Sequence, residues 1–161
     1  MPLAQEFVFG PRYMRLPEGY FVLVRKGNEV GAFRLQHVSQ KQDGTGTSMY
    51  ESFILEKERP RNISLTNQKS GVIEIKQVRG IHPFTWQPGN NEIHVGAWKF
   101  GCLTPSLVNM SSHFSESDDG FEFAPTAAQT PTDIKPFDQN LRWVHFDNES
   151  RVTIPITAVA K

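Results

Sequence analysis

The feature that most constrains this fold is an alternation of apolar and polar residues along most of the chain. Turn-forming residues interrupt it at intervals of roughly 10 to 20 residues, and apolar residues rarely recur at helical spacing. A period of two is typical of β-strands with one buried face. Because 161 residues suffice for one core, the sequence predicts a single all-β domain over residues 1–161. We expect an antiparallel sandwich or barrel, jelly-roll-like or a β-meander.

The first hairpin is predicted around Gly27-Asn28, because both residues tolerate the positive φ of a primed turn. Alternation on the two sides of this turn brings apolar residues together on one face and opposite charges together at the tip. The predicted pairs are Lys26–Glu29, Val24–Gly31, Val22–Phe33 and Tyr20–Leu35.

A second hairpin is predicted around Asp43-Gly44, a sequence that favours a type I′ turn. Its register agrees with the first hairpin, since both place Phe33 and Leu35 on the core face. Residues 20–56 are therefore expected to form a three-stranded meander. The predicted pairs are Val38–Met49, His37–Tyr50, Arg34–Phe53 and Phe33–Ile54.

The last hairpin is predicted to join residues 141–146 to residues 151–156 through a polar turn. Pro155 has no N–H to donate to a ladder, so either its strand is expected at a sheet edge or Pro155 is expected at a position without a ladder hydrogen bond. The predicted pairs are Leu141–Ile156, Trp143–Ile154 and His145–Val152.

Two further strands are expected at 71–79 and 92–100, with a turn at residues 87–90. The stretch 103–140 is rich in Ser, Thr, Pro and Asp and is predicted to be a long polar loop, with 121–123 as a candidate short strand inside it. Lys57, Arg59 and Arg61 flank Pro60 and are expected in a solvated loop between strands, with a phosphate-binding patch as the alternative.

Composition excludes several classes of protein. Lysine plus arginine and aspartate plus glutamate both number 17, so the net charge of zero argues against nucleic-acid binding. The one cysteine, Cys102, excludes an internal disulfide and is expected to pack as a small hydrophobe. The five histidines lack metal-ligand spacing, and phosphate-loop and nucleophile-elbow motifs are absent, so we expect neither metal nor cofactor.

A candidate ligand site is predicted around the strand at 92–100. Alternation there places His94, Gly96 and Trp98 on one face, where the glycine would leave a notch between an imidazole and an aromatic wall. Trp86, beside the Pro88-Gly89 turn, is the tryptophan most expected to be exposed for binding. The candidate ligand-binding residues are His37, Tyr50, His82, Trp86, His94 and Trp98.

The function that these features favour is a non-catalytic binding module. Its ligand would be a small molecule or carbohydrate, or a protein partner such as a second copy of the chain. The alternative is a hydrolase or isomerase with a histidine-lined, metal-dependent or metal-free pocket, in which His94 acts as general base and Glu92 or Glu74 assists it. No signal peptide or apolar membrane segment is visible, so the expected location is the cytoplasm.

Overall fold

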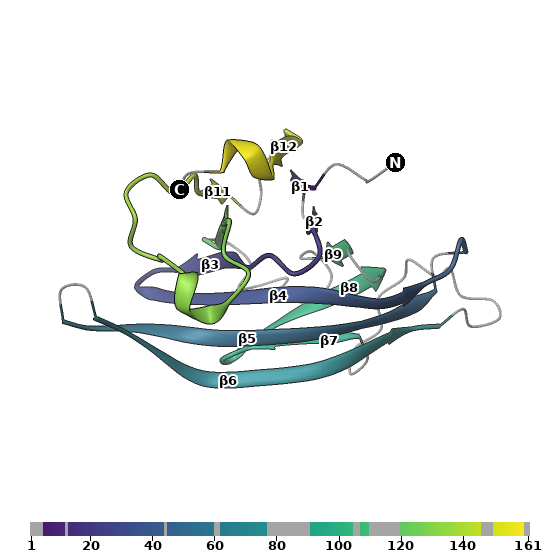
Figure 1. The fold of residues 1–161 in the computed structure, drawn as a ribbon, viewed down its shortest axis with the longest axis horizontal. Helices are drawn as coiled ribbons and strands as arrows, with labels where there is room; N and C mark the ends of the chain where they lie inside the picture. Colours follow the sequence, from purple (N-terminus) through teal and green to yellow (C-terminus); the bar gives the residue numbers. More distant parts are fainter. Residues whose placement is uncertain are drawn as a thin grey trace.

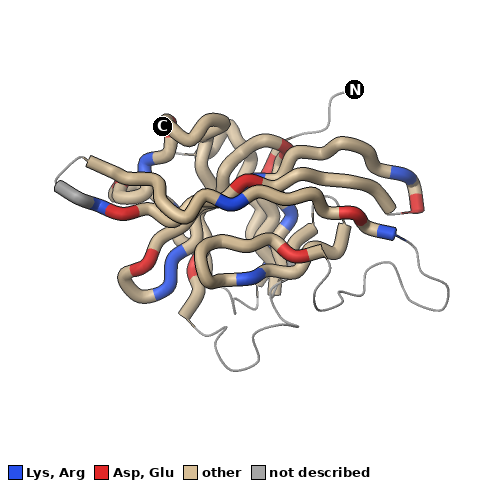
Figure 2. The backbone as a smooth tube through the Cα atoms, turned by 90° about the horizontal axis from the view of Figure 1, so that it is seen from below, with Lys and Arg blue, Asp and Glu red and all other residues tan. Residues whose placement is uncertain are grey.

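The structure is a computed structural model that describes residues 5–11, 13–43, 45–59, 62–76, 91–104, 107–109, 120–145 and 150–159. These residues form two six-stranded antiparallel sheets, which pack together and do not close into a barrel (Figure 1 and Figure 2). The prediction of an all-β sandwich is confirmed. Among the same residues, no helix has the length and apolar character that crossing a membrane requires.

Each sheet is built from strands that are far apart in the sequence (Figure 1). Sheet A contains, in spatial order, β12 (Val152–Pro155), β1 (Glu6–Gly10), β2 (Tyr13–Arg15), β9 (Leu107–Asn109), β8 (Trp98–Thr104) and β7 (Glu92–Val95). Sheet B contains β11 (Val144–His145), β10 (Glu122–Pro125), β3 (Val22–Lys26), β4 (Glu29–Gln40), β5 (Gly46–Arg59) and β6 (Asn62–Ile75). Two short 3₁₀ helices, η1 (Pro131–Asp133) and η2 (Ile156–Ala158), complete the described elements.

The main core lies between the two sheets and is rich in aromatic rings. Phe33 of β4 stacks on Phe100 of β8 with ring centroids 5.7 Å apart. Phe121 meets Phe100 edge to face at 5.6 Å, and Trp98 packs on Phe121 in the same way at 5.4 Å. Offset and edge-to-face geometries are the favourable ones for aromatic pairs. The space between the sheets is thus filled by packed side chains.

The first predicted hairpin is confirmed in its turn and its register. Gly27 has a φ of 60°, and the ladder contains the pairs Lys26–Glu29, Val24–Gly31 and Val22–Phe33. The fourth predicted pair, Tyr20–Leu35, is not part of the ladder, which begins at Val22–Phe33. The carbonyl of Leu35 instead accepts a hydrogen bond from the N–H of Gly19 at 2.8 Å.

The second hairpin forms, but its predicted register is wrong by two residues. The observed pairs include His37–Ser48, Leu35–Tyr50, Phe33–Ser52, Ala32–Phe53 and Gly31–Ile54. The carboxylate of Asp43 accepts hydrogen bonds from the N–H and hydroxyl of Thr45, at 3.0 and 2.7 Å, which builds a longer loop than a two-residue turn. A shift of two preserves the faces, so Phe33 and Leu35 are still in the core.

β6 is longer than the strand predicted at 71–79, and a bulge divides it. Ser52 pairs with Lys69 whereas Ile54 pairs with Thr66, so Asn67 and Gln68 together lie opposite one residue of β5. Asn67 takes a φ of 50°, which the short polar side chain of asparagine tolerates. The bulge exchanges the two faces of β6. Residues 77–90, which include the predicted turn at 87–90, lie outside the described residues.

The last predicted hairpin is wrong, because its two strands belong to different sheets. β11 pairs with β10 in sheet B, whereas β12 pairs with β1 in sheet A, where Ile154 lies opposite Phe7. Trp143 therefore does not face Ile154 and packs against a different apolar cluster. The expectation from Pro155 holds, since β12 is the end strand of sheet A.

The predicted strand at 92–100 is also wrong, because it is a hairpin of two strands. β7 and β8 pair Val95 with Trp98 across a turn at Gly96, whose φ is 58°. A positive φ at the first of two turn residues is typical of a type II′ hairpin. A Cβ built on Gly96 would lie 2.6 Å from the side chain of Ile54 on β5, so the turn also packs tightly on sheet B.

Replacing Gly96 by Ala is expected to lower the free energy of unfolding by about 2–4 kcal/mol, because it adds both left-handed strain and a steric overlap. Gly120→Ala is the matched control: Gly120 also has a positive φ, 92°, but a Cβ there would meet nothing within 4 Å. We expect about 1 kcal/mol for the control, from strain alone. Equal losses for the two variants in urea denaturation would contradict the tight contact between the turn and Ile54.

Candidate functional site

The outer face of sheet B, which points away from sheet A, carries a second apolar cluster. Residues 126–143 cross this face without forming a long strand, and Figure 1 shows η1 in front of β3 and β4. The stretch 103–140, predicted as one polar loop, therefore contains β9 and β10 and ends in a segment that packs on the sheet. The buried members of the outer cluster are Phe21, Leu23, Val30, Ala32, Phe53, Leu55, Ala124, Ala128 and Ile134.

Backbone and hydroxyl groups fix the start of this covering segment, which we define as residues 126–143. The N–H of Phe21 donates to the carbonyl of Ala128 at 3.0 Å. The buried hydroxyl of Thr126 donates to the carbonyl of Phe21 at 2.5 Å and accepts from the N–H of Ala128 at 3.1 Å. The segment thus satisfies polar groups that it would otherwise bury at a cost.

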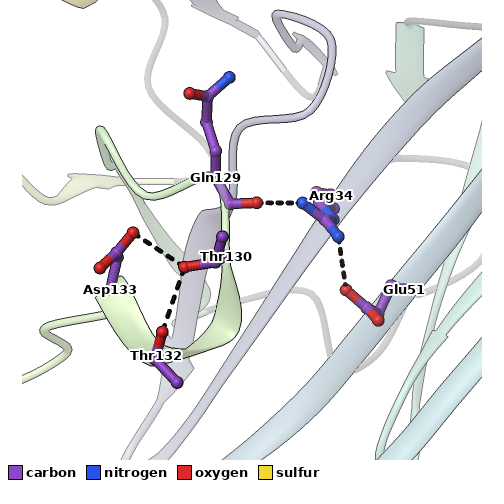
Figure 3. Close-up of polar contacts among 6 residues, drawn as sticks. All are labelled: Arg34, Glu51, Gln129, Thr130, Thr132 and Asp133. Atoms are coloured by element: carbon purple, nitrogen blue, oxygen red, sulfur yellow. Dashed lines mark hydrogen bonds and ion pairs between the residues drawn. The ribbon is translucent and has the colours of Figure 1, made fainter.

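Arg34 attaches the next part of the segment to β4 and β5 (Figure 3). Its guanidinium donates to the carbonyl of Gln129 and lies 3.0 Å from a carboxylate oxygen of Glu51. It also stacks on the Phe21 ring, 4.8 Å from the centroid. The side chains of Arg34 and Glu51 are only 17% and 28% exposed, so water screens this ion pair less than a surface pair. The arginine therefore acts as a clamp.

Beside the clamp, a local turn is held by its own side chains. The hydroxyl of Thr130 donates to the carboxylate of Asp133 at 2.8 Å and lies 3.2 Å from the hydroxyl of Thr132 (Figure 3). Further along, the carboxylate of Asp138 accepts from the N–H of Asn140 at 2.8 Å. Both carboxylates are positioned by short-range contacts, and both line the surface hollows described next.

Two adjoining hollows border the covering segment, and the second of them also reaches Lys57 of β5 and Ile63 of β6. The first has a volume of about 360 Å³ and the second about 390 Å³, and they share Lys135 and Asp138. The first is lined by Thr126, Ala127, Ala128, Asp133, Lys135, Asp138 and Leu141. The second is lined by Lys57, Ile63, Lys135, Phe137 and Asp138. We call the two together the outer groove.

The outer groove combines apolar surface with charges of both signs. Phe137 is 42% exposed and Ile63 is 37% exposed, so both side chains present apolar surface to the second hollow. The ammonium of Lys57 lies 5.2 Å from the centroid of the Phe137 ring. Lys135 and Asp138 complete the lining of the shared region. Apolar walls with a few polar groups are typical of small-ligand sites.

The predicted notch between His94 and Trp98 does not exist. Because a turn separates them, Trp98 packs toward the core while His94 pairs with Lys99 on the opposite face of the hairpin. The imidazole of His94 lies 3.6 Å from the carboxylate of Glu92. The hydroxyl of Ser52 donates to the backbone carbonyl of His94, so it is not aligned with the imidazole as a nucleophile would be.

The other candidates lie in different parts of the fold. His37 is half-buried on β4 beside Ser48. His145, predicted to pair with Val152, is exposed and lies 3.9 Å from Glu122. Tyr50 is buried in the main core, where burial raises the pKa of its phenol above the usual value. His82 and Trp86 lie outside the described residues. Across the described ranges, no three His, Cys, Asp or Glu side chains gather to hold a metal ion.

The lone cysteine is a packed core residue, as the sequence predicted. Cys102 is fully buried, and its thiol donates to the carbonyl of Thr104 at 2.8 Å. Burial raises the pKa of the Cys102 thiol to about 12. Because the thiolate is the nucleophile, this cysteine is inert in the folded protein at neutral pH.

The sequence singles out both segments that line the outer groove, Lys57 and the stretch 103–140, but does not predict that they lie side by side. The sequence predicts Lys57 in a solvated loop between strands, which is wrong because Lys57 lies on β5, and it predicts 103–140 as a long polar loop. The missed signal is the spacing of Ile134, Phe137 and Leu141, three large apolar side chains inside a polar stretch. Large apolar residues in a polar stretch indicate that the segment packs against the apolar surface of another element.

Comparison of the chain with protein-family models, with curated proteins and with solved structures found no match.

Arg34→Ala is expected to destabilise the fold by about 1–3 kcal/mol, because it leaves the Gln129 carbonyl and the Glu51 carboxylate without their cation. Arg25→Ala is the matched control, since Arg25 forms an ion pair with Glu122 at 2.9 Å on β10. Hydrogen exchange of residues 127–133 should become faster in the Arg34 variant alone. Equal acceleration in both variants would contradict the clamp.

The buried thiol predicts a loss of stability at alkaline pH. The unfolded thiol titrates near its ordinary pKa of 9.0, whereas the folded thiol stays protonated up to about pH 12. Above pH 9 the unfolded state therefore binds fewer protons, and the free energy of unfolding falls as pH rises. In Cys102→Ala this decline should be shallower, by up to about 1.4 kcal/mol per pH unit. Parallel pH profiles in urea denaturation would contradict the raised pKa.

Proposed function

We propose that this protein is a non-catalytic binding module and that a small carbohydrate is the ligand of its outer groove. The observation that carries the proposal is that two adjoining hollows share Lys135 and Asp138 beside the exposed ring of Phe137. Together they are large enough for a ligand of one or two sugar rings. A non-catalytic binding module is also the function that the sequence favours, but the proposed site is the outer groove and not the strand at 92–100.

The lining suits a hydroxylated ring better than an anion. Asp133 and Asp138 provide carboxylate oxygens that accept hydrogen bonds from hydroxyl groups, and Lys57 and Lys135 provide donors. Phe137 offers an apolar surface for the C–H face of a sugar. A phosphate would be attracted by the lysines but repelled by the two carboxylates, which disfavours the phosphate-binding alternative.

A catalytic role has less support from the described residues. His37, His94 and His145 lie on β4, β7 and β11, and these histidines line neither hollow of the outer groove. General acid–base catalysis needs a titratable group within hydrogen-bond reach of a bound substrate. The outer groove is therefore the better basis for a function, and it favours binding.

The test is isothermal titration calorimetry with glucose, galactose, mannose, N-acetylglucosamine and β-1,4-linked disaccharides. At least one sugar should bind, and Phe137→Ala should weaken its binding about tenfold, since stacking on the ring is lost. Met49→Ala is the matched control, because Met49 is similarly exposed, at 48%, but lies outside the groove.

Three outcomes would contradict the proposal: no binding of any sugar, equal weakening by both variants, or binding of inorganic phosphate alone.

A further inference from the structure

We propose that β6 is a dimerisation edge, at which two copies of this chain pair their sheets B into one continuous sheet. Among the described strands, β6 is hydrogen-bonded to β5 and lies at the end of sheet B. At 14 residues it is as long as β5, the other strand of its hairpin. In Figure 1 it forms the lower boundary of the described strands. A long end strand presents a row of backbone groups that can pair with another chain.

The other three end strands are short. β11 has two residues, β7 has four, and β12 has four and ends in Pro155. Short strands and proline are the usual protection of sheet edges. By this criterion β6 is the end strand best able to pair with another chain.

Protection of β6 is confined to its middle. The bulge at Asn67 and Gln68 interrupts the ladder, and the charged side chain of Lys69 turns inward, where it donates to the carbonyl of Gly96 at 2.5 Å. A bulge and an inward-pointing charge are both known means of blocking edge pairing. The following residues, Ser70–Ile75, have neither feature, so the pairing would use this part of the strand.

Exposed apolar side chains lie on Ser70–Ile75 of β6 and on the strand beside it. Val72 is 63% exposed and lies directly opposite Met49 of β5, which is 48% exposed. Val38, which is 61% exposed, lies on the neighbouring strand β4, at the bulge between His37 and Ser39. A second copy would extend this apolar row across the junction and cover Val72.

The charges of β6 are compatible with pairing to its own copy. An antiparallel dimer with its two-fold axis at Val72 places Val72 opposite its own copy and Glu74 opposite Ser70. No like charges then lie directly opposite one another. Glu74 and Lys76 already pair within the chain at 3.1 Å, so this end of the strand carries no net charge across the junction. The strand is self-complementary in this register.

Such a dimer would present both outer grooves on the same side of the sheet, and this consequence alone rests on the proposed function. Ile63, in the groove, is nine positions from Val72, which corresponds to about 30 Å along a strand. The two grooves would then lie about 60 Å apart, a spacing suited to a multivalent ligand.

The test is sedimentation velocity of the full chain without any sugar, so its result is independent of ligand binding. The wild type should form a species of twice the monomer mass, and Val72→Lys should weaken the association at least tenfold, because two ammonium groups would meet at the axis. Val38→Lys is the matched control and should leave the association unchanged, since Val38 is equally exposed but lies on β4.

A second pair of variants tests the register. Under oxidising conditions Val72→Cys should form a disulfide-linked dimer, since residues at the axis of an antiparallel pair bring their Cβ atoms about 4.5–5.5 Å apart. Val38→Cys should stay monomeric on non-reducing gels. Two results would overturn the proposal. One is a wild type that remains monomeric at about 200 µM, a concentration at which weak dimers form. The other is a Val38→Cys dimer that forms as readily as the Val72→Cys dimer.

Discussion

The structure depends on the fact that sheet B is apolar on both faces. The run Tyr20–Val24 has no polar interruption, so alternate side chains enter the main core and the outer cluster. Sheet A can cover only one of these faces. The second must be removed from water by something else, and the covering segment 126–143 does this with Ala128, Ile134 and Leu141. The groove lies where that cover meets the projecting β5–β6 hairpin.

Local patterns predicted the parts of the fold that local chemistry decides. The Gly27 turn and its register are correct, and the two-residue error in the next hairpin left every face unchanged. The hairpin at Gly96 was missed although its signal is present: apolar residues fall on odd positions up to Val95 and on even positions from Trp98. That change of phase marks a two-residue turn. The partner of β12 could not be found, because β1 lies at the other end of the chain.

The candidate site was harder to predict because it depends on the meeting of distant segments. A histidine notch required only alternation within one strand, and it failed when that strand proved to be two. The outer groove requires Lys57 and Phe137 to meet across 80 positions of sequence, which alternation and turn signals do not encode. The sequence does contain the reason why the two segments meet, because the polar stretch carries large apolar residues that must be buried. In the structure, one of them, Ile134, is buried on sheet B.

The bulge at Asn67 links the groove and the proposed dimer edge. Without it, Ile63 and Leu65 would share a face with Ile73 and Ile75, since all four lie at odd positions. With it, Leu65 packs on the outer cluster and Ile63 lines the groove, while Ile73 and Ile75 enter the main core. The same exchange turns Val72 outward and Lys69 inward. One extra residue in β6 therefore places Ile63 in the outer groove at one end of the strand. At the other end it exposes Val72, on which the proposed dimer depends.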